Sequence, residues 1–392
     1  MPASPSRLRA GILLAALAAL LASLGCQTRP LPLRASVQAD VYIAGAAFHA
    51  RSAGDLWIID AFSPAVKGRL RVGAGPLALA FNPARNELYC LNRGARDLAI
   101  FDVVGRRPIG RIPLHATPTA MLLSPDHLYA LIAVRIRRQG WVLKLDLPSR
   151  TIVARRKVGP DPVALAISLS GTRLLVADAA ARQVWILDNH GADLRQAAVL
   201  ALPGAPSRIR ILPYGPQAFV LCPDVNQVTV LNYLQPALVT SLTVGHQPDD
   251  MALKPDGGEL YVANGADGTV SIIDTSSDEV SGLMLAGAGP MGMTVTADGS
   301  YLYVANAQSN TVSVLRLQDR KALADIPVGI RPERLLLGPF GRFLYVLDAG
   351  SNDIAVVQTD LDAMLTLLPS PPQAAAMSLV TFHQPPSPAP AS

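Results

Sequence analysis

The chain has 392 residues, of which half are hydrophobic and only 16% are charged. This composition supports a large apolar core and excludes a disordered chain, and a formal net charge of +5 is too small to predict a nucleic-acid partner. The 30 Gly and 33 Pro residues predict many turns between short strands rather than long helices.

Residues 1–25 are expected to be an export signal that lies outside the folded domain. Arg7 and Arg9 form its positive start, and 11–25 is an uncharged apolar run of 15 residues. That run is short for a membrane-spanning helix, which needs about 20 residues, and suits a signal peptide. Cleavage removes two arginines and no acid, so the mature chain has a formal charge of +3.

The signal ends in Ser23-Leu24-Gly25-Cys26, which resembles the lipobox of bacterial lipoproteins. In that family the cysteine receives diacylglycerol and becomes the first mature residue. Gly25 fits this pattern, whereas Leu24 and Ser23 depart from the usual order. The resemblance implies a lipid anchor at Cys26 in the bacterial cell envelope, and Gln27, which is not the aspartate of inner-membrane retention, favours the outer membrane facing the periplasm. The alternative is ordinary cleavage, which gives a soluble periplasmic or secreted protein.

A repeat of 42–44 residues runs through the rest of the chain. The first recurring position is a proline before a short apolar run: Pro76, Pro118, Pro162, Pro206, Pro248, Pro290 and Pro332. A second is the end of a later alternating run: Asp60, Asp102, Asp146, Asp188, Asn232, Asp274, Arg316 and Gln358. Each unit has four short runs rich in β-branched residues and separated by Gly, Asp and Asn turns, which predicts four strands. A repeat of this length with four strands is typical of one β-propeller blade.

Three units carry nearly the same second strand. It reads Leu-Tyr-Val-Ala-Asn at 260–264 and 302–306, and Leu-Tyr-Val-Leu-Asp at 344–348. These motifs resemble the Tyr-Val-Thr-Asn (YVTN) repeat β-propeller family, and the resemblance covers residues 40–382. It implies a propeller but no single activity, because the family contains binding proteins, surface proteins and enzyme-associated domains.

The repeats predict an all-β propeller of eight four-stranded blades. Seven units from Pro76 onward are complete, and the N-terminus adds three strands that lack an inner partner. A lone C-terminal strand at 372–382 would join them, so that one C-terminal plus three N-terminal strands close the ring and leave no exposed edge. Seven blades, with 32–40 as a separate first strand, is the alternative. The expected organisation is a signal at 1–25, a linker at 26–39, the propeller at 40–383 and a Pro/Ser-rich tail at 384–392.

The inner strand of each blade is expected to line the central channel, where propellers place ligands. Small residues dominate two positions after each proline, but three units have arginine or aspartate there. The charged residues in and beside these strands are Arg208, Arg210, Asp249, Asp250, Arg331, Glu333 and Arg334. Converging charges of this kind could bind a carboxylate, a phosphate or a glycan. Alternatively, Arg208 and Asp250 lie on adjacent blades and only pair with each other at the channel rim.

No metal site or cofactor is expected. The six histidines share no metal-ligand spacing, and the sequence has no nucleophile elbow, glycine-rich nucleotide loop or EF-hand loop. Cys90 and Cys222 lie three repeats apart and are expected to be free, buried thiols.

These observations favour a monomeric, membrane-anchored, non-catalytic binding or scaffold module that presents its propeller face to a protein or glycan partner. One alternative is a lactonase-type hydrolase with its site at the channel mouth, for which Arg208, Asp250, Glu333 and Arg334 are the candidate set. Another is an accessory protein of a periplasmic dehydrogenase or metal pathway. Enzymatic activity stays an open question, and the sequence leans against it.

Overall fold

The computed structural model describes residues 36–46 and 53–384. The predicted signal, Cys26 and residues 385–392 lie outside them, as does most of the expected linker. The propeller unit spans Ala39–Phe382. Over the described ranges, no helix has the length and hydropathy needed to cross a membrane.

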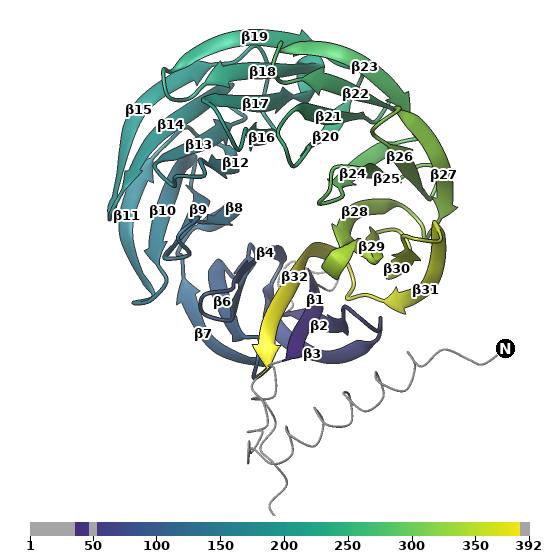
Figure 1. Cartoon of the computed structure of the whole chain (residues 1–392). Helices are drawn as coiled ribbons and strands as arrows, with labels where there is room; N and C mark the ends of the chain where they lie inside the picture. The colour runs from purple at the N-terminus through teal and green to yellow at the C-terminus, as the bar shows by residue number, and fades with distance from the viewer. Residues whose placement is uncertain (1–35, 47–52, 385–392) are drawn as a thin grey trace, which may run out of the picture. The chain divides into compact units, whose positions relative to one another are not determined.

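The described residues form eight four-stranded antiparallel sheets arranged as blades around a ring (Figure 1). One blade joins the two ends of the propeller, with β32 beside β1 (Figure 1). From its outer to its inner edge it contains β3 (Val66–Ala74), β2 (Ala53–Asp60), β1 (Ser36–Ala46) and β32 (Ala374–Gln384). The prediction of eight blades closed by one C-terminal and three N-terminal strands is therefore confirmed, and the seven-blade alternative is wrong. The closing strand begins two residues later than predicted.

The other seven blades are continuous in sequence, each starting with its inner strand. The first four consist of β4 (Pro76–Asn82), β5 (Glu87–Asn92), β6 (Asp97–Asp102) and β7 (Arg107–Pro113); β8 (Thr117–Leu123), β9 (Tyr129–Ile136), β10 (Gln139–Asp146) and β11 (Thr151–Lys157); β12 (Pro162–Ile167), β13 (Arg173–Asp178), β14 (Gln183–His190) and β15 (Asp193–Ala201); and β16 (Arg208–Ile211), β17 (Gln217–Cys222), β18 (Gln227–Asn232) and β19 (Ala237–Thr243).

The last three consist of β20 (Pro248–Leu253), β21 (Glu259–Asn264), β22 (Thr269–Asp274) and β23 (Glu279–Leu285); β24 (Pro290–Val295), β25 (Tyr301–Asn306), β26 (Thr311–Arg316) and β27 (Lys321–Pro327); and β28 (Pro332–Leu337), β29 (Phe343–Asp348), β30 (Asp353–Gln358) and β31 (Ala363–Pro369). Two short 3-10 helices also occur, η1 (Pro223–Val225) and η2 (Pro339–Gly341). We call the face with the loops before the inner strands the upper face. The lower face carries the turns between first and second and between third and fourth strands.

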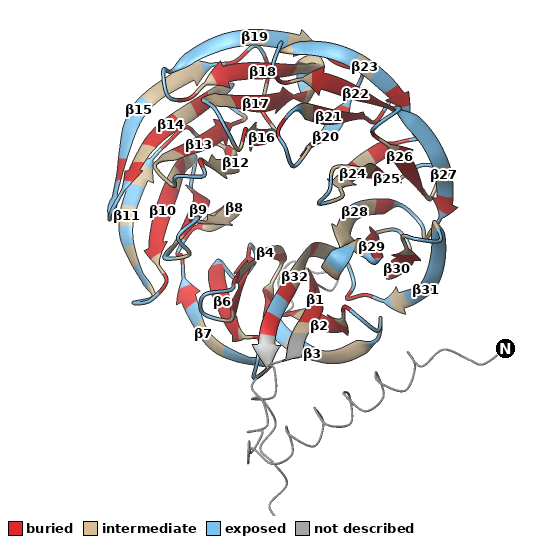
Figure 2. Cartoon of the chain, in the orientation of Figure 1, coloured by how far each residue is buried: buried red, intermediate tan, exposed pale blue. Residues whose placement is uncertain are grey.

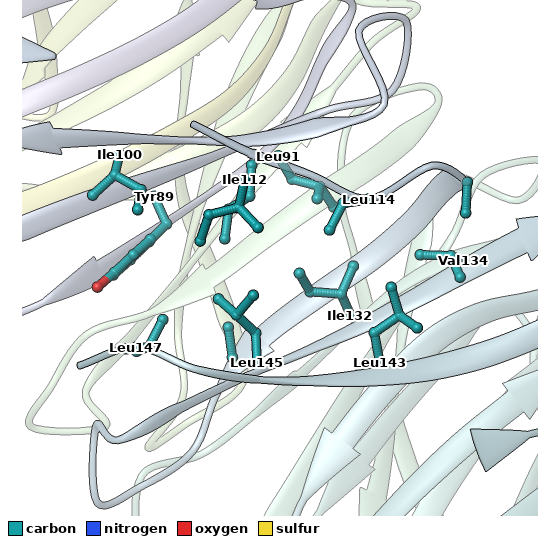
Figure 3. Close-up of a cluster of buried hydrophobic side chains, with 13 residues drawn as sticks. Tyr89, Leu91, Ile100, Ile112, Leu114, Ile132, Val134, Leu143, Leu145 and Leu147 are labelled. Carbon is teal, nitrogen blue, oxygen red and sulfur yellow. The ribbon is translucent and has the colours of Figure 1, made fainter. Parts of the chain in front are cut away.

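Burial follows the position of each strand in its blade. Figure 2 shows the two middle strands largely buried, the outer strands exposed and the inner strands in between. The core lies mostly between blades, as in the cluster of Figure 3, where Tyr89 and Ile100 of one blade pack with Ile132 and Leu145 of the next. Each such buried aliphatic side chain contributes about 1.5–3 kcal/mol, so the blades stabilise one another around the ring. Cys90 and Cys222 are buried and free, as expected.

A bulge lies at the start of six inner strands, directly after the first proline of the repeat. In β20 the register shifts between Pro248 and Asp250, and in β28 between Pro332 and Arg334. The extra residue of a bulge leaves the ladder and re-aims its neighbours. The bulge therefore presents two successive charged residues at the upper end of the channel in both strands.

Candidate functional site

A cavity of about 340 Å³ lies on the propeller axis, at the inner strands β4, β16, β20, β24, β28 and β32. One part of its lining is charged and the other is apolar. The charged residues are Arg208, Asp249, Asp250, Glu333 and Arg334. The others are Leu77, Ala78, Leu79, Met291, Gly292, Met293, Leu335, Leu336, Ala375, Ala376 and Met377. Five of the seven channel residues proposed from the sequence thus meet in one cavity.

Arg208 and Asp250 form the pair that the sequence suggested. The Arg208 Nε donates to Asp250 Oδ1 at 3.3 Å, and the backbone N–H of Met293 donates to Asp250 Oδ2 at 3.3 Å. One carboxylate therefore links the inner strands of three neighbouring blades. Because the Arg208 side chain is 44% exposed and Asp250 only 18%, the pair lies at the channel wall and not in the core.

Arg210 takes part in the same network but does not line the cavity. Its Nη2 lies 3.8 Å from Asp250 Oδ1, and its Nε donates to the carbonyl of Met251 at 3.1 Å. These contacts hold the arginine between blades, which gives it a positioning role for Asp250.

Arg331 and Arg334 also differ in whether they line the cavity. Arg331 lies outside the cavity lining, and its Nε lies 3.0 Å from Glu333 Oε1. Arg334 lines the cavity, is exposed, and forms no ion pair or side-chain hydrogen bond with any of the residues described. Glu333 is thus neutralised by Arg331, and Arg334 contributes an uncompensated positive charge.

Asp249 is the bulge residue of β20. The pKa of its carboxyl is raised above the usual range because the channel wall removes water from it and the Asp250 charge lies nearby, while Arg208 opposes both effects. Its Oδ2 lies 2.8 Å from where a Cβ on Gly265 would be, so the carboxyl is in close contact with the loop after β21. The cavity therefore contains one acid with a weakened tendency to ionise.

The apolar part of the lining was not predicted from the sequence. Met291 and Met293 lie two positions apart on β24, so the side-chain period of two in a strand was the available signal, and Met377 lies on β32. A second missed signal is a Gly-x-x-Pro spacing before the inner strands. At Gly287, three residues before Pro290, a Cβ would lie 2.6 Å from the Asn306 amide, so only glycine lets this loop turn into the channel.

Within the described parts of the chain, no three His, Cys, Asp or Glu side chains come together as they would around a metal ion. His246 lies on the loop before β20, with its Nδ1 3.0 Å from Asp267 Oδ1. His115 occupies the matching loop before β8 with a positive φ of 54°. Neither histidine lines the cavity.

Eight four-stranded blades around a partly charged axial cavity define the chain as an eight-bladed β-propeller. The family model described as the Cytochrome D1 heme domain matches residues 84–281, about half of the chain. This protein belongs to that family. The model of the 7-bladed β-propeller lactonase matches residues 231–334.

Two curated relatives are the proteins called YncE of Salmonella typhi and of Salmonella typhimurium strain LT2. They are 26% identical to this chain over 250 and 249 residues, covering 58% of this chain and 67% of theirs. Among solved structures, dihydro-heme d1 dehydrogenase NirN in complex with DHE has a TM-score of 0.70 at 14% identity, covering 91% of this chain and 78% of its own. Hydrazine synthase of Kuenenia stuttgartiensis has a TM-score of 0.58 at 19% identity, covering 74% of this chain and 96% of its own. At these identities the two structures show a shared propeller fold.

The family name implies a haem, whose iron proteins hold through His, Cys, Tyr or Met side chains. Of the described residues that line the cavity, none is His, Cys or Tyr, and the thioethers of Met291, Met293 and Met377 are the sole candidate ligands. Thioether ligation of haem normally accompanies a histidine, which this lining lacks. The cavity therefore does not fit an iron-ligating haem site.

Proposed function

We propose that this protein is an exported, lipid-anchored member of the YVTN-repeat propellers that binds a small organic acid in its channel and does not change it chemically. The observation that carries this proposal is the guanidinium of Arg334, which lies beside an apolar wall and pairs with no acid of the described residues. Guanidinium groups recognise carboxylates through two parallel hydrogen bonds, and apolar lining favours a ligand with an apolar body.

Arg208 supplies a second contact to the same ligand. Only its Nε donates to Asp250, and its two terminal nitrogens form no hydrogen bond with the described residues. In this proposal the free edge of Arg208 donates to the ligand while the Arg208–Asp250 pair stays intact. At about 340 Å³ the cavity lies at the small end of the range for ligand pockets, roughly 300–1,000 Å³.

The lining supports binding better than catalysis. Among the described residues it contains no Ser, Thr, Cys, Lys, His or Tyr side chain, so its three acids are the sole groups there that could act as a nucleophile. Two of its three acids, Asp250 and Glu333, are held in ion pairs. The proposed partner is consequently an organic acid, with an acidic glycan as the larger ligand of the same chemistry, and the proposed location is the outer membrane facing the periplasm.

Titration calorimetry with hexanoate and glucuronate as probes tests this function, with hexanol and glucose as neutral controls. We expect hexanoate to bind, and Arg334→Gln to weaken its affinity about tenfold or more with an unchanged melting temperature. Arg316→Gln, on the lower face and paired with Asp319, is the matched control and should bind as the wild type does. Equal affinities for wild type and Arg334→Gln, or binding of hexanol as strong as hexanoate, would refute the proposal. Preference for glucuronate over hexanoate would point to the acidic glycan.

A lactonase-type hydrolase is the second candidate, because the lactonase match at 231–334 includes Asp249, Asp250 and Glu333. The raised pKa of Asp249 suits a general acid or base. Gluconolactone hydrolysis above the uncatalysed rate, lost in Asp249→Asn, would favour this activity. The same slow rate with and without protein would favour a non-catalytic role.

A further inference from the structure

Neighbouring blades are connected on the lower face by a recurring contact, which we call the interblade latch. The fourth residue after a third strand reaches back to the start of the second strand in the preceding blade. Arg150 Nη2 donates to Glu87 Oε1 at 3.3 Å, and Arg320 Nη2 donates to Glu259 Oε1 at 3.2 Å. Both arginines have a positive φ, 57° and 56°, which directs the side chain sideways toward the neighbouring blade.

Each of these latches also includes a tyrosine and a carbonyl group. Tyr89 donates its hydroxyl to Glu87, and Tyr261 donates its hydroxyl to Glu259 at 2.6 Å. The arginine donates in addition to a fourth-strand carbonyl, that of Ile109 at 3.1 Å in one latch and that of Ser281 at 2.9 Å in the other. The guanidinium therefore fills a site built from a carboxylate and a carbonyl, and the tyrosine holds that carboxylate.

The gap between the blade of β24–β27 and the blade of β28–β31 lacks this latch. Asp362 occupies the arginine position, again with a positive φ of 47°, and Tyr301 occupies the glutamate position. No hydrogen bond or ion pair joins these two residues. An arginine reaches the equivalent site in three other gaps, since Arg106 Nη2 also lies 3.0 Å from Asp40 Oδ2, whereas no cation of the described residues fills the site at Asp362.

A groove of about 850 Å³ lies at this gap. It is lined by Thr294, Val295, Thr296, Ala297, Asp298, Tyr301, Tyr303, Leu323, Leu336, Leu337, Gly338, Phe340, Gly341, Thr359, Asp360 and Asp362. Three of these described residues are aspartates and none is Lys, Arg or His. Leu323 is the equivalent of Ile109 and Ser281, the residues whose carbonyls accept from the latch arginines.

Tyr303 supplies an independent sign of a ligand. Its side chain is only 2% exposed and lines the groove, yet its hydroxyl has no hydrogen-bond partner in the described part of the protein. Burial, with the Asp362 charge nearby, raises its pKa to about 12, so it stays a neutral donor and acceptor. At the rim, Phe340 is 94% exposed with a positive φ of 57°, which is costly for a bulky residue and holds its ring outward.

We propose that this groove is a docking site for a lysine side chain on a basic segment of a partner protein. The three carboxylates select a cation, and the exposed ring of Phe340 provides an apolar contact beside it. The whole chain carries a net positive charge, so attraction of a basic segment has to come from this local acidic surface.

Lysine is favoured over arginine by one methyl group. In the two latches the guanidinium lies over a glycine, with Nη1 only 2.9 Å from a Cβ at Gly110 and 2.6 Å from one at Gly282. The equivalent residue of the β24–β27 blade is Ala324, whose methyl occupies that space. A compact ammonium group fits beside this methyl better than a planar guanidinium.

Titration calorimetry with the peptide acetyl-Gly-Leu-Lys-Leu-Gly-amide tests the proposal, with the same peptide carrying Nε-acetyl-lysine as its control. We expect the lysine peptide to bind about tenfold more tightly than the acetylated one, and Asp362→Asn to remove most of that difference. Asp319→Asn changes an exposed acid on the neighbouring turn and should leave the affinity unchanged. Equal binding of the two peptides, no binding, or full affinity in Asp362→Asn would overturn the proposal.

A second variant rebuilds the latch. Tyr301→Glu/Ala324→Gly/Asp362→Arg gives this gap the residues of the Arg320–Glu259 gap. The internal arginine should occupy the groove, so peptide binding should be lost while the melting temperature stays equal or rises. Retained peptide affinity in a folded triple variant would show that the peptide binds elsewhere. If this variant does not fold, Asp362→Asn alone decides.

Discussion

Asp348 shows how one buried residue couples the propeller to pH. It ends β29, has no exposed surface, and its Oδ2 accepts hydrogen bonds from the backbone N–H groups of Gly329 and Ala355. Burial, together with the nearby charge of Asp353, raises its pKa to about 8 despite these donors. The matching positions of another blade hold Asn92 and Asp97, joined by an amide-to-carboxylate hydrogen bond of 2.7 Å.

Asp348→Asn should stabilise the protein at high pH. The native state keeps the Asp348 proton up to about pH 8, whereas the unfolded chain loses it near its ordinary value, so the free energy of unfolding of the wild type falls as pH rises between the two. Asparagine does not ionise, so the variant keeps its free energy of unfolding as the pH rises. Its amide can also donate to Asp353 as the amide of Asn92 donates to Asp97. We expect the free energy of unfolding of the variant to exceed that of the wild type by about 1–3 kcal/mol at pH 8. This difference should shrink toward pH 4, and thermal unfolding across this range measures it.

Asp274→Asn is the control, because the pKa of Asp274 is shifted in the opposite direction from that of Asp348. Hydrogen bonds from Ser276 lower the pKa of Asp274, so its replacement should not stabilise the protein at pH 8. A melting temperature for Asp348→Asn that matches the wild type at both pH 4 and pH 8 would contradict the prediction.

Strand β32 is the element on which ring closure depends. It places Val380 and Phe382 in the core shared with β1, β2 and the following blade, and it completes a sheet whose other three strands come from the opposite end of the chain. Without it, β1 becomes an open edge, and the closed ring becomes an open array.

Deleting residues 374–392 should therefore lower the free energy of unfolding by more than about 3 kcal/mol, because two large side chains leave the core and a strand edge is exposed. Deleting only 385–392 is the control and should leave the melting temperature unchanged. Both can be compared by calorimetry or circular dichroism. A protein that melts normally without β32 would mean that closure contributes little to stability.

At the scale of the whole molecule, lipid attachment would place the channel and the groove at a membrane surface. Cys26→Ser should abolish labelling by a fatty-acid analogue and release the protein into the soluble periplasmic fraction. Fractionation of cells that produce the wild type and the variant measures this directly. Wild-type protein that is already soluble and unlabelled would exclude the anchor.

Strand number, repeat length and the closing arrangement could be predicted from the sequence. Each blade repeats the same local alternation of apolar residues and the same turn residues, and such short-range patterns determine secondary structure directly. The inner-strand charges could be located as well, since Arg208, Asp250 and Arg334 occupy a position defined by the repeat.

The tertiary structure alone decided what these residues contact. Asp250 contacts Arg208 and Met293, which lie on the inner strands of the blades before and after its own, whereas Arg334 has no ion-pair partner among the described residues. The lower groove arises because Asp362 lies opposite Tyr301 across a blade gap, a pairing of residues 61 positions apart. Charge neutralisation, pKa shifts and empty latch sites depend on distances between blades, and no local sequence pattern encodes those distances.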